Sequence, residues 1–112
     1  MTREAFSKSH PQVVFMQIQT QSIQFKADAS LIRFVEDKLK KLTLFHPGIL
    51  SADVALRIER DQDRENKVVD VKLNVPGMDV FSSRRSSSFE EAVVEAVEAL
   101  RRQLEKARSK AA

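Results

Sequence analysis

The residues that could perform catalysis are few in this sequence of 112 residues. Its two histidines, His10 and His46, have no serine or carboxylate at a spacing that would activate a nucleophile. There is no cysteine, which excludes a disulfide framework and a thiolate metal site. The two glycines, Gly48 and Gly77, are too few for a glycine-rich phosphate cradle. The sequence therefore predicts a protein that is not an enzyme and uses no metal or cofactor.

An acidic stretch from Asp61 to Glu65 begins like a calcium-binding loop. Its sixth position is Asn66, where the sharp turn of such a loop requires glycine. Its twelfth position is Lys72, where a bidentate glutamate should lie. We interpret the stretch as a charged connection between two strands.

Three serines at positions 86–88 follow Arg84 and Arg85, an arrangement that superficially indicates a phosphorylation site. However, Ser87 and Ser88 each precede a glutamate by three residues, which is the pattern of a capping box at a helix start. Serine is strongly preferred at that position. We favour the capping interpretation.

Positive charge gathers near the end of the chain. Lysine and arginine outnumber aspartate and glutamate by 19 to 16 overall, a small excess. Between Arg101 and Lys110, in contrast, there are five cations and one anion. Arg102, Lys106 and Lys110 are spaced four residues apart, so they align on one side of a helix. The helix dipole favours cations in the last turns of a helix, but five cations are more than this stabilisation requires. The pattern is typical of a surface that contacts phosphates.

The aromatic residues limit how such a surface could read RNA. The chain has seven phenylalanines and no tyrosine or tryptophan, and Phe25, Phe34 and Phe89 are predicted to be core residues. The aromatic motif of sheet-stacking RNA-binding domains is absent. An RNA partner is therefore expected to be read through its backbone and shape.

Hydrophobic spacing predicts the elements that position these residues. Alternation indicates a strand over 16–25, with a break near Gln21 and Ser22 that could be a bulge, and further strands over 52–58, 69–75 and 78–83. A helix capped by Asp28 precedes Pro47, with an apolar stripe and one lysine: Leu31, Phe34, Val35, Lys38, Leu39 and Leu42. A long last helix carries the stripe Phe89, Ala92, Val93, Ala96, Val97, Leu100 and Leu104.

The predicted fold class is α+β, in the order β-α-β-β-β-α, with a four-stranded sheet. Each helix has only one apolar stripe, so both must pack on the same face of the sheet. The other face, with Arg57 and Lys72, is left to solvent or a partner.

Several segments together make the stretch 16–110 similar to a known family. They are Met16–Thr20, Leu31–Leu39, Val75–Gly77, Phe89–Ala92 and Ala99–Lys106. In order and spacing these segments resemble the ribosome hibernation promoting factors, also called ribosome-associated inhibitor or sigma-54 modulation proteins. The resemblance covers nearly all of the chain that is expected to be ordered.

The resemblance implies a fold related to double-stranded-RNA-binding domains. It also implies binding to the small ribosomal subunit and its ribosomal RNA near the decoding site, which blocks mRNA and tRNA and inhibits translation in stationary phase or stress. Carried over by position, the RNA contacts are Lys41, Arg85, Arg102, Lys106 and Lys110. The neighbouring cations Arg84, Arg101 and Arg108 complete the predicted RNA-binding set.

The chain also departs from the family pattern. Glu90 lies where many relatives have a tyrosine, which puts a contact by that side chain in doubt. Residues 1–15 are expected to be a disordered tail, which is unusual in the family, before a single ribosome-binding domain over 16–110. Long members carry a second, dimerising domain; this chain resembles a short form, which would need a separate factor to pair ribosomes. No segment is apolar enough to span a membrane, so a cytoplasmic location is expected.

Two other functions compete with this interpretation. The mixed charge of both helices would also suit a protein-interaction module that modulates a transcription (sigma) factor. A small hydrolase on a ferredoxin-like scaffold is less favoured, because that fold normally ends on a strand and no phosphate cradle is visible.

Overall fold

The apolar and polar spacing of the sequence produces one mixed sheet and two long helices. In the computed structural model, which describes residues 16–59 and 66–111, β1 is Gln17–Ile23, α2 is Ala29–Lys40 and a 3-10 turn, η1, is Lys41–Leu44. They are followed by β2 (Ser51–Ile58), β3 (Lys67–Val75), β4 (Met78–Ser86) and α3 (Phe89–Ala111). The predicted order β-α-β-β-β-α is confirmed. The predicted tail, 1–15, and most of the charged connection lie outside the described residues.

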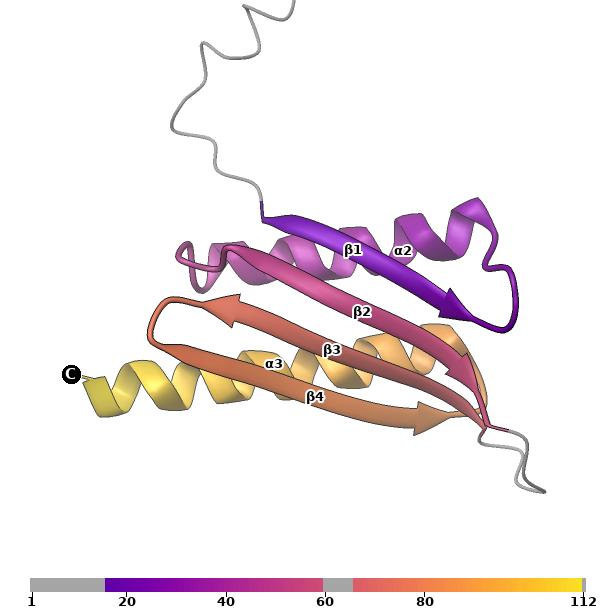
Figure 1. Cartoon of the computed structure of the whole chain (residues 1–112). Coiled ribbons are helices and arrows are strands. Elements are labelled where there is room, and N and C mark those ends of the chain that lie inside the picture. The colour runs from indigo at the N-terminus through magenta and orange to yellow at the C-terminus, as the bar shows by residue number, and fades with distance from the viewer. Residues whose placement is uncertain (1–15, 60–65, 112) are drawn as a thin grey trace, which may run out of the picture.

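The four strands lie in the order in which they occur in the chain. β1 pairs in parallel with β2, and the pairs β2–β3 and β3–β4 are antiparallel. Helix α2 makes the crossover that the parallel pair requires. Figure 1 shows both helices on one face of the sheet, α2 behind β1 and β2 and α3 behind β3 and β4. The prediction that the helices share one face is confirmed.

β1 runs continuously to Ile23, so the predicted break near Gln21 and Ser22 is wrong. The alternation simply continues, with Ser22 toward the helices and Ile23 on the open face, 38% exposed. The chain then turns at Gln24, which has a φ of 65°. Phe25, whose position indicated a change of parity, stacks on Phe89 at the start of α3, with ring centroids 5.1 Å apart.

Both helices begin at the predicted caps. The Asp28 carboxylate accepts a hydrogen bond from the Leu31 backbone N–H at 2.8 Å, and the Ser88 hydroxyl accepts from the Glu91 N–H at 3.1 Å. These bonds satisfy backbone donors that the first helical turn leaves free. Ser87 forms no capping box with Glu90; its hydroxyl donates instead to the Glu91 carboxylate.

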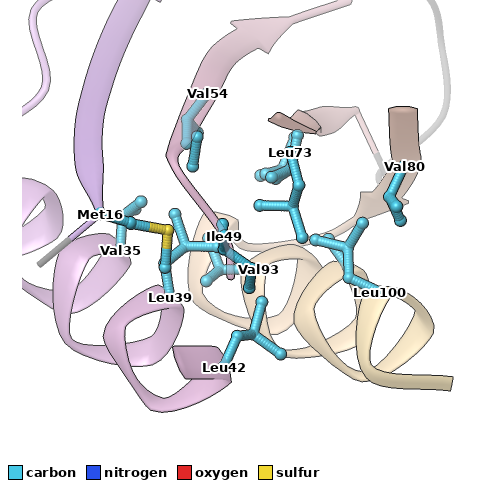
Figure 2. Packing of buried hydrophobic residues seen from close by; sticks show 14 of the residues in the cluster. Met16, Val35, Leu39, Leu42, Ile49, Val54, Leu73, Val80, Val93 and Leu100 are labelled. Atoms are coloured by element: carbon cyan, nitrogen blue, oxygen red, sulfur yellow. The ribbon is translucent and has the colours of Figure 1, made fainter. Parts of the chain in front are cut away.

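The core lies between the helices and the covered face of the sheet. Figure 2 shows Leu39 beside Met16 and near Ile49, Leu42 nearer Val93 of α3, and Leu100 of α3 directed toward Val80 of β4. Each fully buried leucine or valine contributes about 1.5–3 kcal/mol relative to an exposed one. This packing fixes α3 against β4 and thereby determines which of its cations face the strand.

β4 is longer than predicted, because it continues past Ser83 to Ser86. The tight turn at Pro76 and Gly77 joins it to β3, and the φ of +85° at Gly77 is one that glycine adopts without strain. Arg84 and Arg85 are therefore strand residues and not loop residues. Consecutive strand residues point to opposite faces, so these two arginines are separated.

Candidate nucleic-acid interface

Arg84 lies on the covered face of β4, at the edge of the sheet and beside α3. The register pairs it with Val69, whose side chain is fully buried under the helices. It lines a groove between β4 and α3 together with Ala99, Arg102, Gln103, Glu105 and Lys106. We call this set of residues the β4–α3 groove. Three of the eight predicted RNA-binding residues, Arg84, Arg102 and Lys106, thus converge from two elements.

The α3 side of the β4–α3 groove is anchored to the edge of the sheet. The Gln103 side-chain amide donates a hydrogen bond to the Phe81 carbonyl oxygen of β4 at 2.8 Å. Because Phe81 is on an edge strand, that carbonyl would otherwise need water as its donor. Charge and periodicity did not single out Gln103, although its position next to Arg102 could have done so.

The groove changes charge along its length. Toward the start of α3, Arg84 and Arg102 also line a depression with Val94, Glu95 and Glu98. Arg102 lies 3.8 Å from the Glu98 carboxylate, and 62% of its side chain is exposed. Lys106, one turn further along α3, adds a cation beyond Glu95 and Glu98, while Glu105, which also lines the groove, pairs with Arg101. The groove is therefore more positive beside Lys106 than beside Glu95 and Glu98.

Arg101, one residue before Arg102, has a different environment. Its guanidinium pairs with Glu98 and with Glu105 and lies 5.6 Å from the centre of the Phe45 ring. The hydrogen bond from Arg101 lowers the pKa of Glu98, and the hydrogen bond to Glu98 raises the pKa of Arg101. Arg101 thus contacts other residues of the protein, and it connects α3 to Phe45, the residue that follows η1.

Arg85 lies on the open face of the sheet, in a network of charges. It pairs with Glu59, which also pairs with Arg57. The Arg57 Nε donates to Asp70 at 3.0 Å, and hydrogen bonds from Arg57 to Glu59 and then Asp70 raise the pKa of Arg57. The structure therefore does not bring Arg85 together with the groove residues.

The three remaining predicted residues, Lys41, Arg108 and Lys110, belong to segments at the end of the sheet where β3 turns into β4. Lys41 begins η1 and is exposed. Figure 1 shows the end of α2 and the C-terminal half of α3 at the same end of the sheet, where the turn between β3 and β4 also lies. Arg108 and Lys110 belong to the last turns of α3, and their side chains lie outside the described residues.

The arrangement offers cations that can contact phosphates. Within residues 16–59 and 66–107, no three histidine or acidic side chains are grouped as a metal site would require. Likewise, none of the helices that the structure describes is long and apolar enough to cross a membrane. The protein is a small α+β domain, and its helix α3 and strand β4 form a cationic groove at one edge of the sheet.

Comparison with known proteins identifies the family. Residues 18–112 match the family described as sigma 54 modulation protein / S30EA ribosomal protein, and the chain belongs to it. No curated protein sequence matches the chain.

Two solved structures share the fold. A ribosomal subunit interface protein from Coxiella burnetii is 21% identical, with a TM-score of 0.75 over 84% of this chain and 99% of that one. The N-terminal domain of Protein Y from Thermus thermophilus is 22% identical, with a TM-score of 0.71 over 81% of this chain and 98% of that one. The predicted family and fold are thus confirmed, and the family makes this a ribosome-associated protein.

Proposed function

We propose that this protein binds the small ribosomal subunit near the decoding site and inhibits translation during stationary phase or stress. It would do so by occupying the space that mRNA and tRNA otherwise use. The observation that carries the proposal is the β4–α3 groove, in which Arg84, Arg102 and Lys106 come together on a chain of a ribosome-associated family.

The charges of the groove support binding to an RNA backbone. Arg102 has one weak ion pair at 3.8 Å, and within the described part of the chain Lys106 has none. A phosphate can therefore bind these side chains without first breaking a strong internal pair. Arginine also suits phosphate recognition because its planar guanidinium donates two parallel hydrogen bonds. No aromatic side chain lines the groove, which agrees with recognition by backbone and shape.

Cosedimentation with ribosomes across a salt series tests the proposal. The double variant Arg102→Glu, Lys106→Glu should lose ribosome binding at low salt, whereas wild-type binding should weaken steeply as salt rises. A control with the same change in net charge is Lys26→Glu, Arg33→Glu, because both cations are exposed and belong to the segment before α2 and to α2 itself. Circular dichroism of each variant checks that it is folded.

The outcomes separate the candidate functions. Loss of binding in the groove variant alone supports the proposal, and inhibition of translation in vitro by the wild type and not by that variant extends it. If wild-type protein stays at the top of the gradient at every salt concentration, the proposal is wrong. The modulator of a transcription factor then becomes the candidate, and a salt-insensitive complex with a protein partner would support it.

A further inference from the structure

One row of side chains crosses the open face of the sheet and includes an exposed aromatic ring. The strand registers pair Gln19 with Asp53, Asp53 with Lys72, and Lys72 with Phe81, so the row contains one residue from each strand. Adjacent strands lie about 4.8 Å apart, which places Lys72 and Asp53 about 5 and 10 Å from Phe81 along the row. Phe81 is 54% exposed, a large value for an apolar side chain.

The surface is hollowed at this row. The depression is lined by residues of all four strands: Gln19, Thr20, Gln21, Asp53, Val54, Ala55, Asp70, Lys72 and Phe81. We call it the sheet hollow. Ala55 lies in the neighbouring row, between Gln21 and Asp70, and its small side chain leaves space between longer ones. Within the described part of the chain, Lys72 and Asp53 have neither an ion pair nor a hydrogen bond through their side chains.

The sheet hollow and the β4–α3 groove meet at a single strand. Arg84 lies on the groove side of β4, while the Phe81 side chain lies on the hollow side. The Phe81 carbonyl accepts the hydrogen bond from Gln103, which itself lines the groove. A strand of RNA whose phosphates lie in the groove therefore has only β4 to pass before it reaches the hollow.

We propose that the sheet hollow binds an unpaired nucleotide of the RNA whose backbone lies in the β4–α3 groove, with its base stacked on Phe81. This inference rests on the proposed function and adds a single-stranded element to it. Stacking on an aromatic side chain accepts any base, because every base has a π-face.

The charges of the hollow orient this nucleotide. Asp53 and Asp70 disfavour a phosphate over the middle of the sheet, whereas Lys72, next to Phe81, attracts one near the β4 edge. The carboxylate of Asp53 suits the hydrogen-bonding edge of a base, since carboxylates accept from base N–H groups. The base is therefore directed inward and the phosphate remains at the edge of β4.

A fluorescent reporter tests the stacking directly. The chain contains no tryptophan, so Phe81→Trp introduces a single one at the site. Adding a single-stranded RNA hexamer at low salt should quench its fluorescence, and a duplex of the same length should quench it far less. The control is Ile58→Trp, at an exposed position at the end of β2 and outside the lining of the hollow. Its emission should change little.

Affinity for the hexamer, measured with a labelled RNA, gives a second readout. Phe81→Ala should weaken binding about tenfold, and Phe81→Leu should weaken it similarly because it keeps apolar surface but loses the ring. Phe81→Tyr should bind like the wild type. All three variants should fold, since the side chain is mostly exposed. Equal affinities of Phe81→Ala and wild type would overturn the inference, as would equal quenching of the two tryptophans.

A negative result for the sheet hollow can be distinguished from failure of the proposed function. If the reporter does not respond but Arg102→Glu, Lys106→Glu still abolishes ribosome cosedimentation, the groove binds RNA and the sheet hollow does not. If wild-type protein does not bind ribosomes at all, the proposed function itself fails.

Discussion

Two pairs of arginines that are adjacent in the sequence have opposite roles in the structure. Arg84 lines the β4–α3 groove, whereas Arg85 pairs with Glu59 on the other face of the sheet. In α3, Arg102 has one long ion pair, while Arg101 pairs closely with two glutamates and lies against Phe45. The number of cations in a segment therefore says little about a binding surface. What matters is which cations already have partners within the protein.

The largest expected effect comes from reversing the charge of Arg84, with the same change at its neighbour Arg85 as the control. Arg84→Glu should weaken ribosome binding tenfold or more, because it removes a phosphate contact and places an anion in the groove. The slope of log K against log salt should also fall by about 0.7–0.9, the value for one phosphate contact. Arg85→Glu should change affinity threefold or less. Cosedimentation at several salt concentrations measures both, and equal losses in the two variants would contradict the division between faces.

A smaller effect is expected from Asp70, which holds the network on the open face. Asp70 accepts hydrogen bonds from Arg57 and from the Ser83 hydroxyl, and 23% of its side chain is exposed. Asp70→Ala should lower the free energy of unfolding by about 1 kcal/mol, because it leaves both donors without this acceptor. Urea denaturation measures the loss. Asp70 also lines the sheet hollow, where its charge disfavours a phosphate, so its loss should not weaken ribosome binding. A large drop in affinity in a folded variant would contradict the orientation proposed for the nucleotide.

The smallest effect concerns a carboxylate that acts only on its own helix. The hydrogen bond from the Leu31 N–H, followed by that from Ser30, lowers the pKa of Asp28 below its ordinary 3.8. A lowered pKa stabilises the folded state above the unfolded pKa, and the stabilisation is lost as pH falls through the folded value. Asp28→Ala should therefore lower the Tm at pH 7, and its difference from wild type should narrow as the pH falls below the ordinary pKa of 3.8. Asp28→Asn, which keeps an acceptor but does not titrate, should lower the Tm less. Thermal melts from pH 7 to pH 2 measure this.

The order of elements could be predicted from the sequence because part of each buried face is marked by apolar spacing. The stripe from Phe89 to Leu104 defines α3, and the caps Asp28 and Ser88 mark where both helices begin. The end of β4 could not be predicted in the same way. Its last inward positions are Ser82, Arg84 and Ser86, and the two serines are buried although they are polar. Small hydroxyl side chains fit there, but they give no apolar alternation.

This limit also explains what could be predicted of the candidate site. The cationic face of α3 follows from the spacing of Arg102 and Lys106, and the structure places both in the groove. The separation of Arg84 from Arg85 follows only from a strand that extends to Ser86. Phe81 could have been recognised as exposed, because Val80 next to it points inward; its position beside Lys72 requires the register of β3 and β4.

The construction of the groove from β4 and α3 has a consequence for synthesis of the protein. A ribosome makes the chain from its N-terminus, so β4 and α3 are made after the other described elements. An incomplete chain that ends before α3 lacks Arg102, Gln103 and Lys106. The surface proposed to bind ribosomal RNA is therefore absent until α3 has been made.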